Sequence, residues 1–315
     1  MTHASETAVR AGAAPRRSLL SRMGDTPIPW VLPLALILIA VFLYPIIEIV
    51  RLGFTDADLV GTDYEYTIGS YTSLFTAPSF ANMLTVTALF VGFSVAFQML
   101  LGFAIALMLD QGTKRNLRGT VITRTAVLSA WAIPGVIIGV IWSLLYAEGE
   151  TGILNYFLTF VGVDDPIAFL SNPTNALIAV TVANIWRGTA FSMIFIYAGL
   201  QTFPQDVIEA AKMDGAGAVN RLFRVVIPIL LPVLLVNMIV IIVDTFNTFD
   251  MVMAMTGGGP GRSTEVIALS IYNQIFNNFD LGSGAATATL LLVINVALTV
   301  VYFRFLEKGK EAKKA

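Results

Sequence analysis

No charged side chain occurs between Glu65 and Asp110, and this gap restricts the possible folds more than any other feature. A helix of about 20 mainly apolar residues crosses the hydrocarbon core of a bilayer, so this segment is long enough to span a membrane. Several other stretches also lack ionisable groups, and 56% of the 315 residues are hydrophobic while 13% are charged. This composition is typical of a membrane protein with several spans and argues against a soluble domain.

Six segments have the length and low polarity that a membrane-spanning helix requires. We predict an all-α integral membrane protein with a six-helix domain over 30–306 and spans at about 30–52, 83–109, 122–146, 176–200, 229–252 and 284–306. Residues 1–29 show no apolar periodicity, so we expect a disordered tail there. The apolar run that follows is long enough to be a retained span, which argues against a cleaved signal peptide. Residues 307–315 form a short basic tail.

Positive charge is unevenly distributed along the chain. Most of the 19 Lys and Arg residues fall in the N-terminal tail, the second-to-third loop, the fourth-to-fifth loop and the C-terminal end. Loops rich in Lys and Arg stay on the cytoplasmic side of a membrane. We therefore predict that both termini are cytoplasmic and that the acidic loops face the opposite side.

The loop between the fourth and fifth spans contains a soluble-looking helix in the sequence FPQDVIEAAKMDGAGAVNRLFRVVIP. Thr202 with Gln205, or Asp206 with Glu209, offers a capping box at its start. Gly215 suits the left-handed position after its end. A second amphipathic stretch follows, so we predict a helix–turn–helix that projects into the cytoplasm. A plain connector between two spans is the alternative.

The same loop carries a spaced pattern: Glu209-Ala210-Ala211, three residues, Gly215, nine residues, then Val225-x-Ile227-Pro228. This pattern resembles the EAA loop of permease subunits of binding-protein-dependent ABC importers, although Val225 and Ile227 stand where that family usually has Ile and Leu. The flanking NIWRGTAFSMIFIYAGLQTF and MTGGGPGRSTEVIALSIYNQIF resemble the maltose and glycerol-phosphate type sugar permeases. The resemblance covers roughly residues 30–306.

The resemblance implies a type I ABC importer permease core and a role as the transmembrane permease subunit of an ATP-driven sugar importer. Such a subunit forms half of the translocation pathway in the bacterial plasma (inner) membrane. The implied partners are a second homologous permease subunit in a heterodimer, two copies of an ATP-binding subunit, an extracytoplasmic solute-binding protein and the sugar, with no nucleic acid. The resemblance implies no cofactor in this chain, because ATP and Mg belong to the ATPase.

The resemblance also assigns the loop over 201–228 as the coupling loop, docked in a groove of the ATPase. The residues that it implies for this contact are Glu209, Ala210, Ala211, Asp214 and Gly215. Glu209 would pair with a basic group of the ATPase, and the two alanines would permit close packing.

Two clusters of polar residues lie within the fourth and fifth spans. Helical spacing places Asn184, Arg187, Gly188 and Phe191 on one face, and Ile241, Asp244, Thr245 and Thr248 on another. An ionised side chain at mid-bilayer costs about 3 kcal/mol, so such groups face protein or water. We expect Arg187 and Asp244 to approach and neutralise each other.

The resemblance places the substrate pocket at these two clusters. It implies that Asn184, Arg187, Gly188, Phe191, Asp244, Thr245 and Thr248 bind the sugar, with Asn247 and Asp250 as secondary candidates. A buried helix–helix pair that makes no substrate contact is the structural alternative for Arg187 and Asp244.

Other functional readings find less support. TGGGPGRS departs from the phosphate-binding loop at Thr256 and Arg262, so Gly257, Gly258, Gly259 and Pro260 are better explained as a tight outer turn that touches the binding protein. One His and no Cys argue against a metal site and against histidine-based catalysis, so we predict a non-catalytic subunit. The alternatives in transport are a self-powered secondary transporter or channel and an ABC permease for a non-sugar solute.

Overall fold

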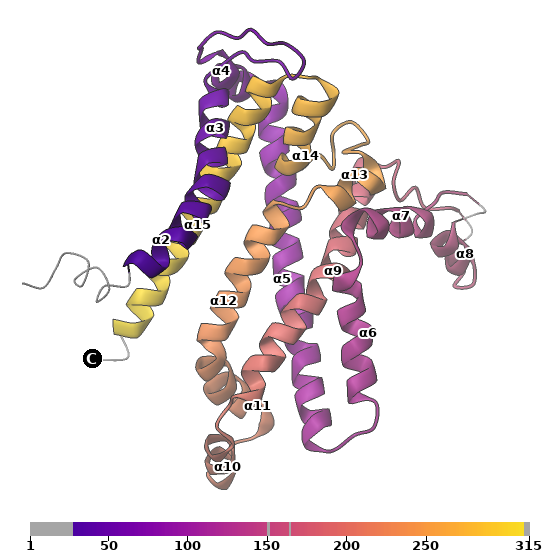
Figure 1. Ribbon diagram of the computed structural model, residues 1–315. Helices are drawn as coiled ribbons and strands as arrows, with labels where there is room; N and C mark the ends of the chain where they lie inside the picture. The colour runs from indigo at the N-terminus through magenta and orange to yellow at the C-terminus, as the bar shows by residue number, and fades with distance from the viewer. Residues whose placement is uncertain (1–27, 150–151, 164, 312–315) are drawn as a thin grey trace, which may run out of the picture. The chain divides into compact units, whose positions relative to one another are not determined.

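A computed structural model describes residues 28–149, 152–163 and 165–311 (Figure 1). The tail predicted over 1–29 lies almost entirely outside these ranges. The chain divides into two compact units, one ending at Ile49 and one beginning at Val50. Each unit is described by itself.

The first unit holds the first predicted span. Helix α2 (Ile28–Leu38) passes through a π-helical turn, η1 (Ile39–Leu43), into α3 (Tyr44–Gly53), which continues into the second unit. Trp30–Gly53 is long and apolar enough to cross a membrane, and most of its apolar side chains are exposed.

The second unit consists of helices joined by loops, and no β-strand occurs in the described ranges, which confirms the all-α prediction. Its helices, apart from α3, are α4 (Gly69–Thr76), α5 (Pro78–Lys114), α6 (Thr120–Ala132), α7 (Gly135–Leu145), α8 (Ile153–Thr159), α9 (Pro173–Gln201), α10 (Gln205–Met213), α11 (Ala218–Arg221), η2 (Leu222–Val226), α12 (Ile227–Phe246), α13 (Asp250–Thr256), α14 (Ile267–Tyr272), η3 (Asn273–Asn277) and α15 (Leu281–Glu311).

Five helices in the described ranges are long and apolar enough to span a membrane, and a bent pair makes six if it counts as one span. The five unbroken candidates contain the predicted first, second and fourth spans and most of the fifth and sixth.

The third predicted span differs from the expected single helix over 122–146. α6 and α7 meet at an angle of 101°. The break lies at Ile133, whose extended backbone (φ −78°, ψ 130°) is the conformation favoured before a proline. Pro134 has no N–H and so cannot continue the hydrogen bonding of α6. After the break, α7 packs against α13.

The fifth predicted span, 229–252, also ends early, because α12 stops at Phe246. Beyond it, Asn247 donates its amide N–H to the backbone oxygen of Val243 (2.7 Å), and the Thr248 hydroxyl donates to that of Asp244 (3.0 Å). Side chains that take backbone carbonyls in this way compete with helix continuation. The chain turns here and resumes in α13.

The core of the second unit is built around α5 and α9, the most extensively packed pair of helices (Figure 1). Buried apolar residues gather in one cluster around Phe90, Ile138 and Met251 and in another around Met193 and Leu230. This packing fixes two long, charge-poor helices side by side, and the polar residues described next lie between them.

Candidate functional site

Gln98 and Gly102 of α5 lie opposite Gly188 and Ser192 of α9, and these two pairs form matched stripes on the facing sides of the helices. A side chain at Gly188 would collide with Gln98, and one at Gly102 would collide with Ser192. Gln98 donates its amide to the backbone oxygen of Asn184 (3.0 Å). Each glycine thus leaves room for a polar side chain of the other helix, as small residues do at membrane helix contacts.

Several buried polar atoms around this contact have no hydrogen-bond partner among the residues that the structure describes. They are Ser94 Oγ, Asn184 Nδ2, Ser192 Oγ and, on α12, Asn237 Oδ1. The amide of Asn237 contacts Met99 Sδ at 3.0 Å. Unsatisfied polar atoms at such depth are costly, so they mark a place where a polar ligand or water gains hydrogen bonds. Of these residues, the sequence reasoning identified Asn184 alone; isolated amides within apolar runs were the missed signal.

Arg187 and Asp244 do not form the predicted ion pair. The described residues include both side chains, and no ion pair joins them. Arg187 Nε is buried without a hydrogen-bond partner, while Asp244 is exposed near the end of α12. On the fifth span the shared face was not observed either, because Thr245 is buried while Asp244 is exposed, and Thr248 lies beyond the end of α12.

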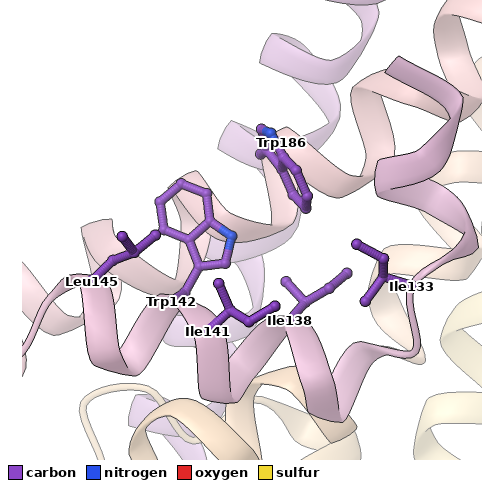
Figure 2. A pocket seen from close by; sticks show the side chains of 6 residues that line it. All are labelled: Ile133, Ile138, Ile141, Trp142, Leu145 and Trp186. Carbon is purple, nitrogen blue, oxygen red and sulfur yellow. The ribbon is translucent and has the colours of Figure 1, made fainter. Parts of the chain in front are cut away.

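Aromatic residues continue the site along α9. The ring centroids of Phe191 and Trp131 lie 5.9 Å apart, and the ring of Phe191 stacks on that of Phe195. Trp186, next to Arg187, lies 6.0 Å from Trp142 of α7. Figure 2 shows these two tryptophans and Ile138 lining an apolar pocket of about 180 Å³.

The tryptophans of this pocket were missed because the bend at Pro134 brings α7 to α9. That bend has only a weak sequence signal, a proline within an apolar run.

The residues predicted on the fifth span are divided by the end of α12. Thr245 and Thr248 are buried, whereas Asn247 is exposed. Asp250 begins α13 and lies so close to Gly135 that a side chain there would collide with its carboxylate. Asp250 therefore faces the start of α7, where the positive end of the helix dipole favours a carboxylate.

Helix α10 carries the predicted coupling residues at one end of the second unit, away from α13 and α14 (Figure 1). Glu209, Ala210 and Asp214 are exposed, and Ala211 is half-buried. The start of α10 differs from the prediction: the residue before the helix is Pro204 rather than Thr202 or Asp206, and the Thr202 hydroxyl donates to the backbone oxygen of Gly199. The side chain of Gln205, the partner predicted for Thr202, lies outside the described part of the chain. Pro204 explains the different start, since its fixed backbone starts the helix after the positions that Thr202 requires.

The end of α10 confirms the expected glycine turn. Gly215 has φ +78°, in the left-handed region. Its N–H bonds to the oxygen of Lys212, and the N–H of Ala216 bonds to the oxygen of Ala211, both at 3.0 Å. These two bonds are the Schellman pattern that ends a helix sharply. The chain then returns through α11 and η2 directly into α12.

A buried carboxylate joins α5 to the start of this loop. Asp110 accepts hydrogen bonds from Lys114 (2.7 Å) and from Gln201 at the end of α9 (3.1 Å). The hydroxyls of Thr113 and Tyr197 lie 3.1 Å apart nearby. These contacts hold the ends of α5 and α9 together immediately before the loop predicted to be the coupling loop. The sequence reasoning took Asp110 only as the end of a charge-free run.

The loop after α13 forms the expected tight turn. Gly257 and Gly258 have positive φ, and the peptide bond between Gly259 and Pro260 is cis. Arg262 donates to the buried carboxylate of Glu265 (3.0 Å), and its backbone oxygen accepts from Asn82 of α5 (3.0 Å). The turn is therefore fixed to the beginning of α5.

Comparison with known proteins places this geometry in a family. Residues 98–309 match the family described as binding-protein-dependent transport system inner membrane component. The trehalose/maltose transport system permease protein MalF of Thermococcus litoralis is 35% identical over 75% of this chain and 77% of its own length. The sn-glycerol-3-phosphate transport system permease protein UgpA of Brucella abortus is 30% identical over 88% of this chain and 92% of its own.

Solved structures agree on the fold. A chain of a bacterial ABC transporter involved in the import of the acidic polysaccharide alginate superposes with a TM-score of 0.74 at 20% identity, covering 92% of this chain and 95% of that chain. Two thirds of the present sequence and nearly all of its architecture are thus accounted for by one group of membrane proteins. The chain belongs to the family of inner membrane components of binding-protein-dependent transport systems.

Proposed function

We propose that this chain is the permease subunit of an ATP-driven sugar importer and forms half of its translocation pathway. The observation that carries the proposal is the continuity between two features. The exposed helix α10 follows α9 directly, and α9 holds the unsatisfied Asn184 and the half-buried Arg187. The sugar and glycerol-phosphate permeases among its relatives support this choice of cargo.

In this proposal, α10 transmits the motion of the ATPase to the membrane-spanning helices. Glu209 and Ala210 are exposed, and the Schellman turn at Gly215 makes the helix a short rigid projection. We assign to it the contact with an ATP-hydrolysing partner, present in two copies, which binds ATP and Mg. A rigid element is required because motion in the ATPase reaches the spans only through a part that does not deform.

The sugar is bound at the α9 face and the end of α12. Sugars present many hydroxyl groups and weakly apolar ring faces, so they are recognised by amides, charged groups and aromatic surfaces. Asn184 Nδ2 and Arg187 Nε supply donors without partners, and Phe191 supplies an aromatic surface. Because Asp244 is not neutralised by Arg187, its carboxylate is free to accept hydrogen bonds from sugar hydroxyls.

The remaining assignments extend this site. Gly188 permits the approach of Gln98, while Thr245, Thr248, Asn247 and Asp250 line the region where α12 ends and α13 begins. The turn over Gly257–Pro260 contacts the solute-binding protein on the outer side. Both termini face the cytoplasm, as the distribution of Lys and Arg predicts.

Transport follows an alternating-access cycle with a second, homologous permease subunit. ATP closes the ATPase dimer, which draws the coupling helices together and opens the cavity toward the binding protein. Hydrolysis then returns the cavity to the cytoplasmic side. The present chain has no catalytic role in this cycle.

The test is co-purification from membranes in mild detergent, followed by uptake into vesicles made with the recovered complex. Wild type and the control Asp206→Lys, an exposed acid one turn earlier on α10, are expected to bring down an ATPase and a second permease. Glu209→Lys is expected to lose the ATPase while still inserting in the membrane. Asp244→Ala should retain the ATPase and lose sugar uptake. A chain that purifies alone and moves solute without ATP would contradict the proposal in favour of a secondary transporter.

A further inference from the structure

A second cavity lies away from the sugar site, where the coupling loop meets the membrane-spanning helices. It has a volume of about 650 Å³ and is formed by the ends of α5 and α9 together with α10, α11 and η2. Its size falls in the range of small-molecule sites. None of the residues assigned above to sugar binding or to the ATPase contact lines it.

The walls of the cavity divide into two kinds of surface. Apolar side chains form one part, among them Leu107, Leu200 and Phe203. Four cations form the other, namely Lys114, Arg115, Lys212 and Arg221, with Asp110 as the one acid. The cavity therefore carries a net positive charge beside an apolar surface, and a purely polar ligand would leave that surface unused.

Two of the four cations are already held by the protein. Lys114 is paired with Asp110 (2.7 Å), and Arg221 donates to the backbone oxygen of Ala216 (2.5 Å). Arg115 and Lys212 are exposed, and among the described residues their side chains have no hydrogen-bond or ion-pair partner. They line the same cavity from different elements, Arg115 directly after α5 and Lys212 in α10, so one bound anion could interact with both side chains.

The position of the cavity selects the ligand. Leu107 and Leu200 belong to the last turns of two membrane-spanning helices, and Asp110 is the first charge after the long uncharged run. This is the depth at which an apolar interior gives way to phospholipid headgroups. Basic pockets between helices at that depth bind anionic lipid headgroups.

We propose that this cavity binds an anionic phospholipid. Its phosphodiester lies between Arg115 and Lys212, and the part of an acyl chain next to the headgroup lies along the apolar wall. The proposal goes beyond sugar transport and needs only the inner-membrane location. A free phosphate shares the headgroup chemistry but lacks the chain that the apolar wall fits. A lipid in this place would fasten α10 to the ends of α5 and α9.

The experiment is native mass spectrometry of the full-length chain in detergent, with added phosphatidylglycerol or phosphatidylcholine of identical acyl chains. Wild type is expected to retain phosphatidylglycerol selectively. The variant Arg115→Gln/Lys212→Gln should lower its binding roughly tenfold, since each cation near a headgroup contributes measurably. The matched control Arg118→Gln/Arg224→Gln removes the same charge from exposed residues outside the cavity and should change binding by less than about twofold.

A second variant separates loss of charge from loss of folding. Arg115→Lys/Lys212→Arg keeps both charges and should bind as wild type does. Equal retention of the two lipids, or an equal loss in the control variant, would overturn the proposal. So would displacement of the lipid by excess glycerol 3-phosphate, which would assign the site to a free anion, or by the partner ATPase, which would assign the cavity to that interface. All readouts are independent of uptake, so failure here leaves the transport proposal standing.

Discussion

The molecule buries one carboxylate near each end of its second unit, and the two are used differently. Asp110 pairs with Lys114 four residues later, and Glu265 pairs with Arg262 three residues earlier. Asp110 also accepts from Gln201 on another helix, whereas Glu265 closes its own loop. The same chemistry therefore joins two helices at the end that the proposed function assigns to coupling (the coupling end) and shapes one turn at the end that it assigns to the outer side (the outer end).

The surroundings explain this difference. At the coupling end two long parallel helices finish side by side, so a short acid reaches both. At the outer end the loop is held to α5 by other bonds, from Asn82 to the oxygen of Arg262 and from the N–H of Ile267 to Thr87. A loop with separate attachments tolerates the loss of its ion pair better than a helix pair that shares one carboxylate.

The largest effect is expected from Asp110→Ala. Removing the acid leaves Lys114 and Gln201 without their shared acceptor and should lower the free energy of unfolding by about 2 kcal/mol, less than for a fully buried pair because Lys114 is 39% exposed. Thermal unfolding in detergent measures the loss. ATP hydrolysis that continues without sugar uptake in the assembled complex would show the expected uncoupling.

Gln201→Ala sharpens this test, since it removes the interhelical bond and keeps the ion pair. It should reproduce the uncoupling with a smaller loss of stability. If it behaves as wild type, the bond between α5 and α9 has no part in coupling.

Glu265→Ala should cost about 1 kcal/mol, because its partner Arg262 is 51% exposed. We expect weaker binding of the solute-binding protein, measured with the purified complex, and unchanged coupling at the opposite end. Uncoupled ATP hydrolysis in this variant would contradict the distinction between the two ends.

Two of the left-handed glycines, one in each of these turns, allow a matched comparison at similar cost. Gly215→Ala and Gly257→Ala each force a side chain into a left-handed backbone and should each cost roughly 1 kcal/mol. Co-purified ATPase should fall with the first, and affinity for the binding protein with the second. If both variants lose ATPase and binding-protein affinity alike, the strain at either turn destabilises the whole second unit rather than one end of it.

The smallest effect is expected at Glu148, in the loop after α7. Hydrogen bonds from the hydroxyl and N–H of Ser171 lower the pKa of its carboxyl, and a bond from the N–H of Leu170 adds to them. A lowered pKa in the folded state gives stability that is present above the unfolded pKa and lost as the pH falls through the folded pKa. Glu148→Gln should remove this small acid-side dependence of the melting temperature. A pH profile that is unchanged would show that the contact does not contribute.

The sequence predicted those elements whose structure is determined by their own residues rather than by contacts with other helices. Long uncharged runs identified the spans, and the glycine after an Ala-rich helix identified the turn at Gly215. The break at Ile133 was not recognised because a proline can also be accommodated within a membrane helix. The early end of α12 depends on side-chain bonds of Asn247 and Thr248, which spacing does not reveal.

The candidate site was harder, because it depends on how helices are rotated against one another. Asn184 and Arg187 were identified from their polarity within a span. Gln98 and Asn237 were missed, since their importance arises from the register of α5 with α9 and α12. For the same reason the predicted Arg187–Asp244 pair was wrong: helical spacing orders residues on one helix, but no sequence feature states how α9 and α12 are rotated against each other.

The matched stripes on α5 and α9 also restrict movement. Gln98 fits opposite Gly188, and Gly102 fits opposite Ser192. Sliding one helix along the other by a single turn would place Gln98 against a residue larger than glycine, so the pair has one permitted register. In the proposed cycle, a force applied at α10 would therefore move α5 and α9 together rather than slide one along the other.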